Sequence, residues 1–541
     1  MNAKTVWIKK FLSGLALCAL AFSLILNPAY AEPDAPAATS GSYLGGDSYD
    51  DLAIGVPGEN RGNMFTDSGQ INVFYAQWLG LDDPGNQLWM QGVDGMQGIT
   101  EDGDNFGDSL ASGDFNGDNL PDLAIGVPYE DIDTIIEAGV VHIMYGAPDG
   151  LSSVGNQMWS NDDFGEGGAE SYDRFGDVLA VGDFDGNGFD DLAIGMPFED
   201  LGATNAAGAV VVLYGSSSGL DDPVWQLWHQ DTPGIPGVAE AGDQFGVSLA
   251  TGDFDKDGYD DLAVGVPAED VGSLAEAGAV NIIYGTSAGL DDAGSQIWDQ
   301  DSTGILDDAE DHDLFGFALA AGDFDGDGSD DLAIGAPFED LGTIGDAGLV
   351  NVLYGSDTGI SDSNQVWRQD VGFIPDDPEL TDRFGYSLTT GNFNGDTYDD
   401  LVIGVPFECL DATINAGAIH VIYGSASRLR TNGNQMFSQV VLGEWDTFGW
   451  TMATGHFNGD GYEDLAISAP RATLGGQQDA GEVSILYGFM TGLVYAAAET
   501  FDQDSPGILG AAEAGDYFGW SLAALEIDTY RTWIPLVMDN P

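Results

Sequence analysis

The hydrophobic residues of this chain lie in short runs rich in Val, Ile, Leu and Tyr, and clusters of Gly, Asp, Asn and Pro separate the runs. One series, within residues 247–301, reads VSLATGDF, DLAVGVP, AGAVNIIYG and QIWDQD. Runs this short, bounded by turn residues, are typical of β-strands, and no segment keeps the 3.6-residue period of an amphipathic helix. The pattern therefore predicts an all-β protein.

The whole series recurs along the chain. Its clearest marker is a Gly-x-Pro tripeptide, Ser-x-Pro in the last copy, with the proline at Pro57, Pro128, Pro197, Pro267, Pro337, Pro406 and Pro470. Successive prolines are 71, 69, 70, 70, 69 and 64 residues apart. A unit of about four strands cannot bury both of its faces alone, but units arranged around an axis bury them against one another. We expect a seven-bladed β-propeller of four-stranded blades.

The two ends of the chain complement each other. The first copy begins near Gly41, inside an acidic loop, and lacks the Phe-Gly segment that opens the other copies. A surplus Phe518-Gly519 near the other end is followed by WSLAALEI and by no further Gly-x-Pro. Pairing of this surplus strand with the strand from Asp51 onward would complete a shared blade and remove exposed sheet edges. We therefore predict a ring closed by N- and C-terminal strands.

The sequence predicts four segments. Residues 1–31 have the lysine-containing start, the apolar stretch and the small-residue cleavage site of a secretory signal peptide. Residues 32–40 fit a flexible lead-in, 41–527 the propeller, and 528–541 a tail outside the repeat. An uncleaved anchor is the weaker interpretation, because the apolar stretch is short for a bilayer span. We expect a protein that is secreted, periplasmic or on the cell surface.

Acidic loops lie between the first and second strands of the copies. Four of them read DFNGDNLPD, DFDGNGFDD, DFDKDGYDD and DFDGDGSDD, with acidic or amide side chains at positions 1, 3, 5 and 9. Hard oxygen ligands in this number suit Ca²⁺, whereas Mg²⁺ prefers a smaller octahedron that retains water. The predicted ligands of these four loops are Asp114, Asn116, Asp118 and Asp122; Asp183, Asp185, Asn187 and Asp191; Asp253, Asp255, Asp257 and Asp261; and Asp323, Asp325, Asp327 and Asp331.

These loops differ in their predicted affinity. Those from Asp253 and Asp323 offer four carboxylates and should bind calcium more tightly than those from Asp114 and Asp183, which offer three. Weaker candidates in the sixth copy are Asn392, Asn394, Asp396 and Asp400. The seventh loop begins with His456 and is a weak site or none, and the first loop has lost its opening ligands. A single such turn is also compatible with a solvated loop held by Asx hydrogen bonds, but recurrence of mutually repelling carboxylates favours a cation.

The overall charge changes the choice of partners. The chain has 91 Asp and Glu against 12 Lys and Arg, for a formal net charge of −79. Such a surface repels phosphate backbones and anionic lipid heads, which argues against nucleic acid and bare membrane as partners. Self-repulsion on this scale also favours bound cations, and adaptation to salty surroundings is a compatible alternative.

The Phe-Gly pairs, the Gly-x-Pro turns and the acidic loops together resemble the FG-GAP repeat family, whose best-known members are integrin α-subunits. The resemblance covers about residues 41–525. It implies a seven-bladed propeller with calcium loops on the face opposite the one that engages a ligand or a partner subunit. It implies no particular ligand.

Catalytic residues are not evident in the sequence. The five histidines form no Ser-His-Asp motif and no zinc spacing, and His142 and His420 share a third-strand position that favours packing. Cys409, the one cysteine after the leader, is interpreted as a tolerated substitution. We expect a calcium-binding module for adhesion to protein or glycan, and no enzyme. The alternative is a carbohydrate-active lyase or hydrolase on a propeller scaffold.

Two repeated features have more than one interpretation. Tryptophans recur at matching fourth-strand positions, namely Trp89, Trp159, Trp228, Trp298 and Trp367. They favour packing between blades over a sugar-stacking platform. The Glu-Asp pairs after Gly-x-Pro, such as Glu199-Asp200 and Glu339-Asp340, fit turn residues better than ligand contacts.

Overall fold

The computed structural model describes residues 49–526, apart from 62–64, 78–79, 82–85, 165–167, 221–224, 370, 372–373, 411–412, 440 and 442. All of these residues belong to one compact unit, Tyr43–Pro541. The predicted signal peptide, lead-in and tail, and the start of the first acidic loop, lie outside the described residues. Among the residues described, no helix is long and apolar enough to cross a membrane.

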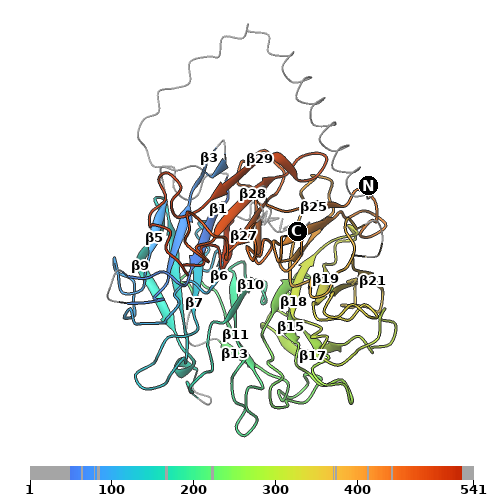
Figure 1. The fold of residues 1–541 in the computed structure, drawn as a ribbon. Helices are drawn as coiled ribbons and strands as arrows, with labels where there is room; N and C mark the ends of the chain where they lie inside the picture. The colour runs from blue at the N-terminus through green and yellow to red at the C-terminus, as the bar shows by residue number, and fades with distance from the viewer. Residues whose placement is uncertain are drawn as a thin grey trace, which may run out of the picture. The chain divides into compact units, whose positions relative to one another are not determined.

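Seven antiparallel sheets of four strands form a ring of blades, which confirms the predicted all-β propeller (Figure 1). In hydrogen-bonded order, the first three blades are β30 (Leu522–Leu525), β1 (Asp51–Val56), β2 (Gln70–Phe74) and β5 (Gln87–Trp89); β6 (Ser109–Gly113), β7 (Asp122–Val127), β8 (Val140–Ala147) and β9 (Gly150–Trp159); and β10 (Val178–Gly182), β11 (Asp191–Met196), β12 (Ala209–Leu213) and β13 (Trp225–Trp228).

The remaining four blades follow the same order. They are β14 (Leu249–Gly252), β15 (Asp261–Val266), β16 (Ala279–Tyr284) and β17 (Asp291–Trp298); β18 (Ala318–Gly322), β19 (Asp331–Ala336), β20 (Leu349–Leu353) and β21 (Asn364–Trp367); β22 (Ser387–Gly391), β23 (Asp400–Val405), β24 (Ala418–Ile422) and β25 (Gln435–Phe437); and β26 (Met452–Gly455), β27 (Asp464–Ala469), β28 (Glu482–Tyr487) and β29 (Val494–Phe501). Outside the blades lie the short pair β3 (Ala76–Gln77) and β4 (Gly80–Leu81) and the 3-10 turn η2 (Asn161–Asp163).

The second strand of every blade is buried along its whole length, as the DLAIGV-like runs lead one to expect. Strands buried on both faces read as continuous apolar runs because neighbouring blades cover each face. The glycine of Gly-x-Pro serves this packing. A Cβ atom at Gly126 would lie 2.1 Å from the carbonyl oxygen of Gly176 in the next blade, so only glycine fits there.

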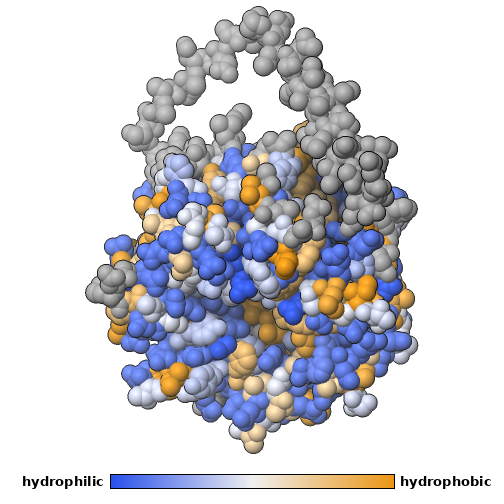
Figure 2. Space-filling view, viewed as in Figure 1, coloured by the Kyte–Doolittle hydropathy of each residue, from blue (hydrophilic) through white to orange (hydrophobic). Residues whose placement is uncertain are grey.

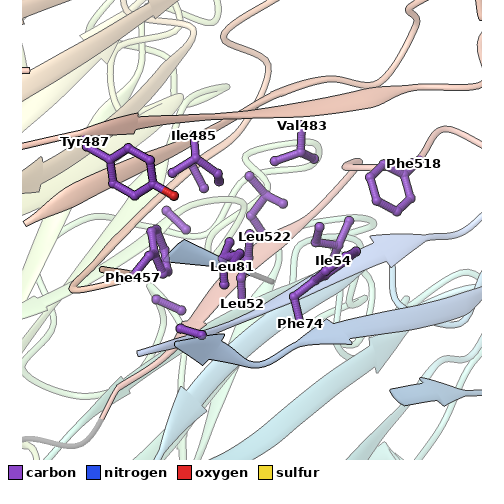
Figure 3. Close-up of a cluster of buried hydrophobic side chains, with 14 of the residues drawn as sticks. Leu52, Ile54, Phe74, Leu81, Phe457, Val483, Ile485, Tyr487, Phe518 and Leu522 are labelled. Atoms are coloured by element: carbon purple, nitrogen blue, oxygen red, sulfur yellow. The ribbon is translucent and has the colours of Figure 1, made fainter. Parts of the chain in front are cut away.

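The ring closes through strands from the two ends of the chain, as predicted. β30 pairs with β1 in antiparallel register, with Leu522 opposite Ile54 and Leu525 opposite Asp51. β30 also lies against β26 and β6, so the first strands of all seven blades form a closed series of neighbours. Figure 3 shows the apolar cluster at this closure, where Leu52 and Ile54 pack with Val483, Phe518 and other residues from the end of the chain.

The antiparallel order of the strands gives the propeller two different faces. Hairpins between first and second strands lie at one face, and the Gly-x-Pro turns after the second strands lie at the other with the Phe-Gly segments. The face visible in Figure 2 is mostly hydrophilic, with apolar residues in a recess near its middle, as the high net charge leads one to expect.

Candidate metal centres in the hairpin loops

The acidic hairpins bring the side chains at positions 1, 3 and 9 together in three blades. Within each group, one carboxylate oxygen from every member lies within 4.8 Å of the others. The groups are Asp183, Asp185 and Asp191; Asp253, Asp255 and Asp261; and Asp323, Asp325 and Asp331. Three carboxylates at this separation repel one another, and a divalent cation with oxygen ligands would remove the repulsion.

Backbone hydrogen bonds fix the first and ninth side chains, as the loop from Asp253 illustrates. Asp253 accepts hydrogen bonds from the N–H groups of Asp257 at 2.9 Å and Gly258 at 3.0 Å. Asp261 accepts from Phe254 at 2.9 Å and from Gly285, at the end of the third strand, at 2.8 Å. Equivalent bonds recur in the loops from Asp183 and Asp323, so the backbone orients these carboxylates before any ion binds.

The aspartates at position 5, which are also predicted ligands, lie outside the three close groups, and their role as ligands stays a prediction. Asp257 accepts the N–H of Tyr259 at 3.1 Å, and Asp327 accepts that of Ser329 at 2.9 Å. Each bond is a local Asx turn, which holds the side chain against its own loop. At position 3, Asp185 and Asp255 form the same kind of turn with the N–H groups of Asn187 at 3.0 Å and Asp257 at 3.2 Å. Asp325 Oδ1 differs, because it is buried and has no hydrogen-bond partner among the described residues, as expected of an oxygen available to a cation.

Loops with asparagine at position 3 satisfy their ninth carboxylate differently. Asn116 Nδ2 lies 3.2 Å from Asp122 Oδ2, and Asn394 Nδ2 lies 3.2 Å from Asp400 Oδ2. The amide donates to the carboxylate that a cation would otherwise neutralise. In the seventh loop His456 Nδ1 lies 3.0 Å from the carbonyl oxygen of Tyr462. The loops from Asp114 and Asp183, which the sequence ranked together, therefore differ in this contact, and the predicted order of calcium affinity stays a prediction.

Burial raises the pKa of the ninth aspartate in every loop of this set, and neighbouring carboxylates add to the effect. The pKa rises to about 9 for Asp191 and Asp331 and to about 8 for Asp122, Asp261 and Asp400. Desolvation and like charge both disfavour the ionised form. A bound cation acts in the opposite direction and would keep these groups ionised at neutral pH.

Neighbouring hairpins among the described residues are tied together by a contact that the sequence did not predict. The N–H of Asp253 donates to Asp330 Oδ2 at 2.9 Å, and the N–H of Asp330 donates to the carbonyl oxygen of Asp253 at 3.0 Å. The same reciprocal pair links Asp183 to Asp260 and Asp323 to Asp399. The signal was present in the Asp-Asp doublet at positions 8 and 9, of which only the second residue was assigned a role.

The histidines and tryptophans lie where a packing role places them. His142 and His420 are 0% exposed, and neither ring nitrogen of either has a hydrogen-bond partner among the described residues. Burial lowers the pKa of His142 to about 4 and that of His420 to about 3, so both are neutral at physiological pH. Trp228 and Trp367 are buried in the apolar clusters between blades, which argues against a sugar platform at these two positions.

Cys409 occupies a position that is aspartate in other copies. Its sulfur accepts the N–H of Asn415 at 3.5 Å. The equivalent N–H groups in other blades are bound by Asp131, Asp200 and Asp340 at 2.8 to 3.0 Å. The free thiol therefore takes over a turn contact. The predicted turn role of the Glu-Asp pairs holds for these aspartates, whereas the glutamates Glu130, Glu199 and Glu339 are buried.

Comparison with known protein families identifies the same repeat. The FG-GAP repeat family matches residues 106–144, 175–213, 245–282, 315–353, 384–422 and 448–486. The chain is an FG-GAP repeat protein. Each matched segment of this FG-GAP propeller begins at a Phe-Gly pair and ends in a third strand, so it contains the acidic hairpin and the Gly-x-Pro turn. The propeller is integrin α-like, as the resemblance implied.

Relatives of known function match only in part. The FG-GAP propeller is 34% identical over 219 residues to phosphatidylinositol-glycan-specific phospholipase D of Bos taurus, covering 39% of this chain and 25% of that protein. It is 31% identical over 234 residues to integrin alpha-PS2 of Drosophila melanogaster, covering 41% of this chain and 15% of that protein. The chain thus spans a quarter or less of the length of these relatives.

The similarity to solved structures concerns the fold alone. The exotype rhamnogalacturonan lyase YesX is 12% identical and covers 83% of this chain and 76% of its own, with a TM-score of 0.38. At this level the similarity carries no argument about activity.

Proposed function

We propose that this FG-GAP propeller is an exported binding module whose hairpin loops take calcium on one face and whose opposite face engages a protein or glycan. Binding, without catalysis, is the proposed activity. The supporting observation is an arc of four aromatic side chains, each of which directly follows a Phe-Gly pair in the sequence. These residues lie at the face opposite the hairpin loops, because they precede the first strand of each blade.

The arc consists of Phe317, Tyr386, Trp450 and Trp520, each half-buried and each in the same position of its copy. Adjacent ring centroids are 5.0 Å apart for Phe317 and Tyr386, 5.1 Å for Tyr386 and Trp450, and 5.1 Å for Trp450 and Trp520. The arc was not predicted from the sequence, although the last four Phe-Gly pairs are each followed by an aromatic residue. Half-buried aromatic rings supply contact area for a ligand at a small loss of conformational entropy.

A pocket of about 400 Å³ lies at one end of the arc. Its lining includes Tyr129, Tyr517 and Trp520 together with Asp108 and Arg471. Burial and a neighbouring carboxylate raise the pKa of Asp108 to about 8. Rings beside a few hydrogen-bonding and charged groups suit a sugar ring or a protein side chain. Calcium in the opposite loops would hold the hairpins that set the spacing of the blades.

The test compares ligand retention with turnover. Full-length protein is applied to glycan and protein arrays with calcium and with chelator, and products are analysed for every ligand retained. We expect calcium-dependent retention without product. Trp520→Ala should weaken retention at least about tenfold, as loss of a central aromatic anchor does. Trp445→Ala, which removes a half-exposed indole outside this pocket, should not.

Two results would contradict the proposal. Turnover of a retained glycan would make the protein an enzyme, and equal loss of binding in both variants would remove the aromatic arc as the ligand site.

A further inference from the structure

A second kind of acidic cluster lies at the other ends of the strands, away from the hairpin loops. It joins the turn after the second strand of a blade to the segment that leads into the Phe-Gly pair at the start of the same blade. Between the fifth and sixth blades, one carboxylate oxygen from each of Glu379, Asp382 and Glu408 lies within 4.8 Å of the others. Glu379 is exposed, whereas Asp382 and Glu408 are 0% exposed.

Hydrogen bonds use only half of the buried oxygens in this cluster. Asp382 Oδ2 accepts the N–H of Glu379, and Glu408 Oε2 accepts Nε2 of Gln369 at 2.7 Å. The other oxygens, Asp382 Oδ1 and Glu408 Oε1, are buried and have no hydrogen-bond partner among the described residues. The buried amide oxygen of Gln369 also has no partner, but the equivalent oxygens of Gln230 and Gln300 in other blades are in the same state, so the two carboxylate oxygens distinguish this cluster. Buried acceptors without donors are rare and costly, and they indicate a missing ligand.

The charges around the cluster are of one sign. Burial and neighbouring carboxylates raise the pKa of Glu408 to about 9. Those neighbours are Asp382, Asp376 and Glu379. Arg383 follows Asp382 in the chain, but its guanidinium stacks over the rings of Phe338 at 4.4 Å and Phe407 at 4.7 Å. The positive group nearest in sequence is therefore directed at aromatic rings.

A fourth carboxylate replaces a glycine at this cluster. Asp376 has a φ of 90°, in the left-handed region, where three other copies have Gly98, Gly237 and Gly510 with φ of 85°, 113° and 120°. Aspartate at such a φ is less favourable than glycine, so the position accepts a strained residue that adds negative charge beside Glu408.

A similar cluster lies between the fourth and fifth blades. One oxygen from each of Glu310, Asp313 and Glu339 lies within 4.8 Å of the others. In this second cluster Asp307 occupies the position of Asp376, and it forms an ion pair with Arg368 at 3.7 Å. This second cluster therefore has a cation of its own, and the cluster of Glu408 is the stronger candidate for an external one.

We propose that Glu379, Asp382, Glu408 and the amide oxygen of Gln369 form a calcium site between the fifth and sixth blades, separate from the hairpin loops. Three carboxylates and an amide oxygen are hard ligands of the kind that calcium accepts, and water would complete its coordination. The site would fix the segment leading into the sixth blade against the turn that follows its second strand. None of these residues belongs to a hairpin loop, so the site does not depend on calcium binding there.

The test counts calcium ions on the full chain by native mass spectrometry and equilibrium dialysis with calcium alone. Glu408→Gln should bind one ion fewer per chain than the unchanged protein. Glu269→Gln is the matched control, because Glu269 occupies the same turn position and accepts Gln230 Nε2 at 2.7 Å but belongs to no such cluster. The control should keep the full number of ions.

A second variant distinguishes loss of a calcium ligand from misfolding. Glu379→Gln changes an exposed residue, so the fold should persist while the affinity of one ion falls about tenfold or more. An unchanged ion count and unchanged affinities in both Glu408→Gln and Glu379→Gln would overturn the proposal. A proton shared between Asp382 and Glu408 would then account for the close carboxylates.

Discussion

Position 3 of the hairpin loops allows a charge-exchange experiment, because the chain contains both versions of it. Asp255 lies with Asp253 and Asp261 in one loop, whereas Asn116 donates to Asp122 in another. We predict that Asp255→Asn stabilises the calcium-free protein and weakens calcium binding at that loop. Asn116→Asp should do the reverse at its own loop, and the double variant keeps the net charge unchanged.

The magnitude follows from the separation of the carboxylates. Two charges 4.8 Å apart repel by about 0.9 kcal/mol in water and by about 3.5 kcal/mol at an effective dielectric of about 20. Burial raises the pKa of Asp261 to about 8, so at pH 7 this group is mostly protonated without calcium, and Asp255 repels chiefly Asp257 and Asp253. Since Asp255 is partly exposed, solvent screening places the expected gain near about 1 kcal/mol at pH 7. The gain should be larger at pH 9, where Asp261 is ionised and also repels Asp255.

The assay is urea unfolding with calcium removed and with calcium saturating, at pH 7 and pH 9, together with calorimetric calcium titration. Loss of one of four carboxylates should weaken the loop's calcium affinity about tenfold or more. The reasoning would be refuted if Asp255→Asn destabilised the calcium-free protein at both pH values. It would also fail if neither single variant changed calcium affinity.

Three other predictions follow from the fold and from the buried titrating groups. The calcium-free protein should lose stability as pH rises from about 4 to about 9, because burial raises the pKa of Asp191 and Asp331 to about 9 from 3.8 and the fold favours their protonated forms. With calcium bound, the free energy of unfolding in urea should depend less on pH. Equal slopes with and without calcium would contradict this. Because burial lowers the pKa of His142 to about 4 from 6.5, the free energy of unfolding should fall by about 3 kcal/mol as pH falls from 6.5 to 4. Urea unfolding of His142→Asn should not show that loss. The exposed His312 is the control, since His312→Asn should leave the loss in place. A chain ended before Leu522–Leu525 should expose the edge of β1 and self-associate, which light scattering would detect; a stable monomer would show that the closing strand is dispensable.

The architecture was predictable because its sequence motifs recur at a regular spacing along the chain. The spacing of the Gly-x-Pro prolines gave the number of blades, and the surplus Phe518-Gly519 gave the closure that β30 makes with β1. Both signals depend on local turn chemistry and on a repeat period, and neither needs knowledge of which blades touch. The positions 1, 3 and 9 of the acidic loops converge for the same reason, because one hairpin contains all of them.

Features that join different blades could not be predicted in the same way. The bond from Asp253 to Asp330 links residues 77 positions apart, and the bond from Gln369 to Glu408 links residues 39 apart. Each residue alone fits a solvated turn, and only the register between blades shows that Glu408 is buried. The side chains at position 5 stay predicted ligands that lie outside the close groups, and Asp257 accepts the N–H of Tyr259 there.

The proposed cluster of Glu408 connects calcium to the ligand face through a short segment of chain. Asp382 contributes to the cluster, Arg383 stacks on Phe407, and Tyr386 of the aromatic arc has its ring centroid 5.4 Å from that of Phe407. Within this segment, a cation that held Asp382 would also limit the movement of Arg383 and Tyr386. Calcium in the hairpin loops acts at the opposite ends of the strands. Selective loss of ligand retention in Glu408→Gln, with the hairpin ions still bound, would therefore follow from local ordering of this segment.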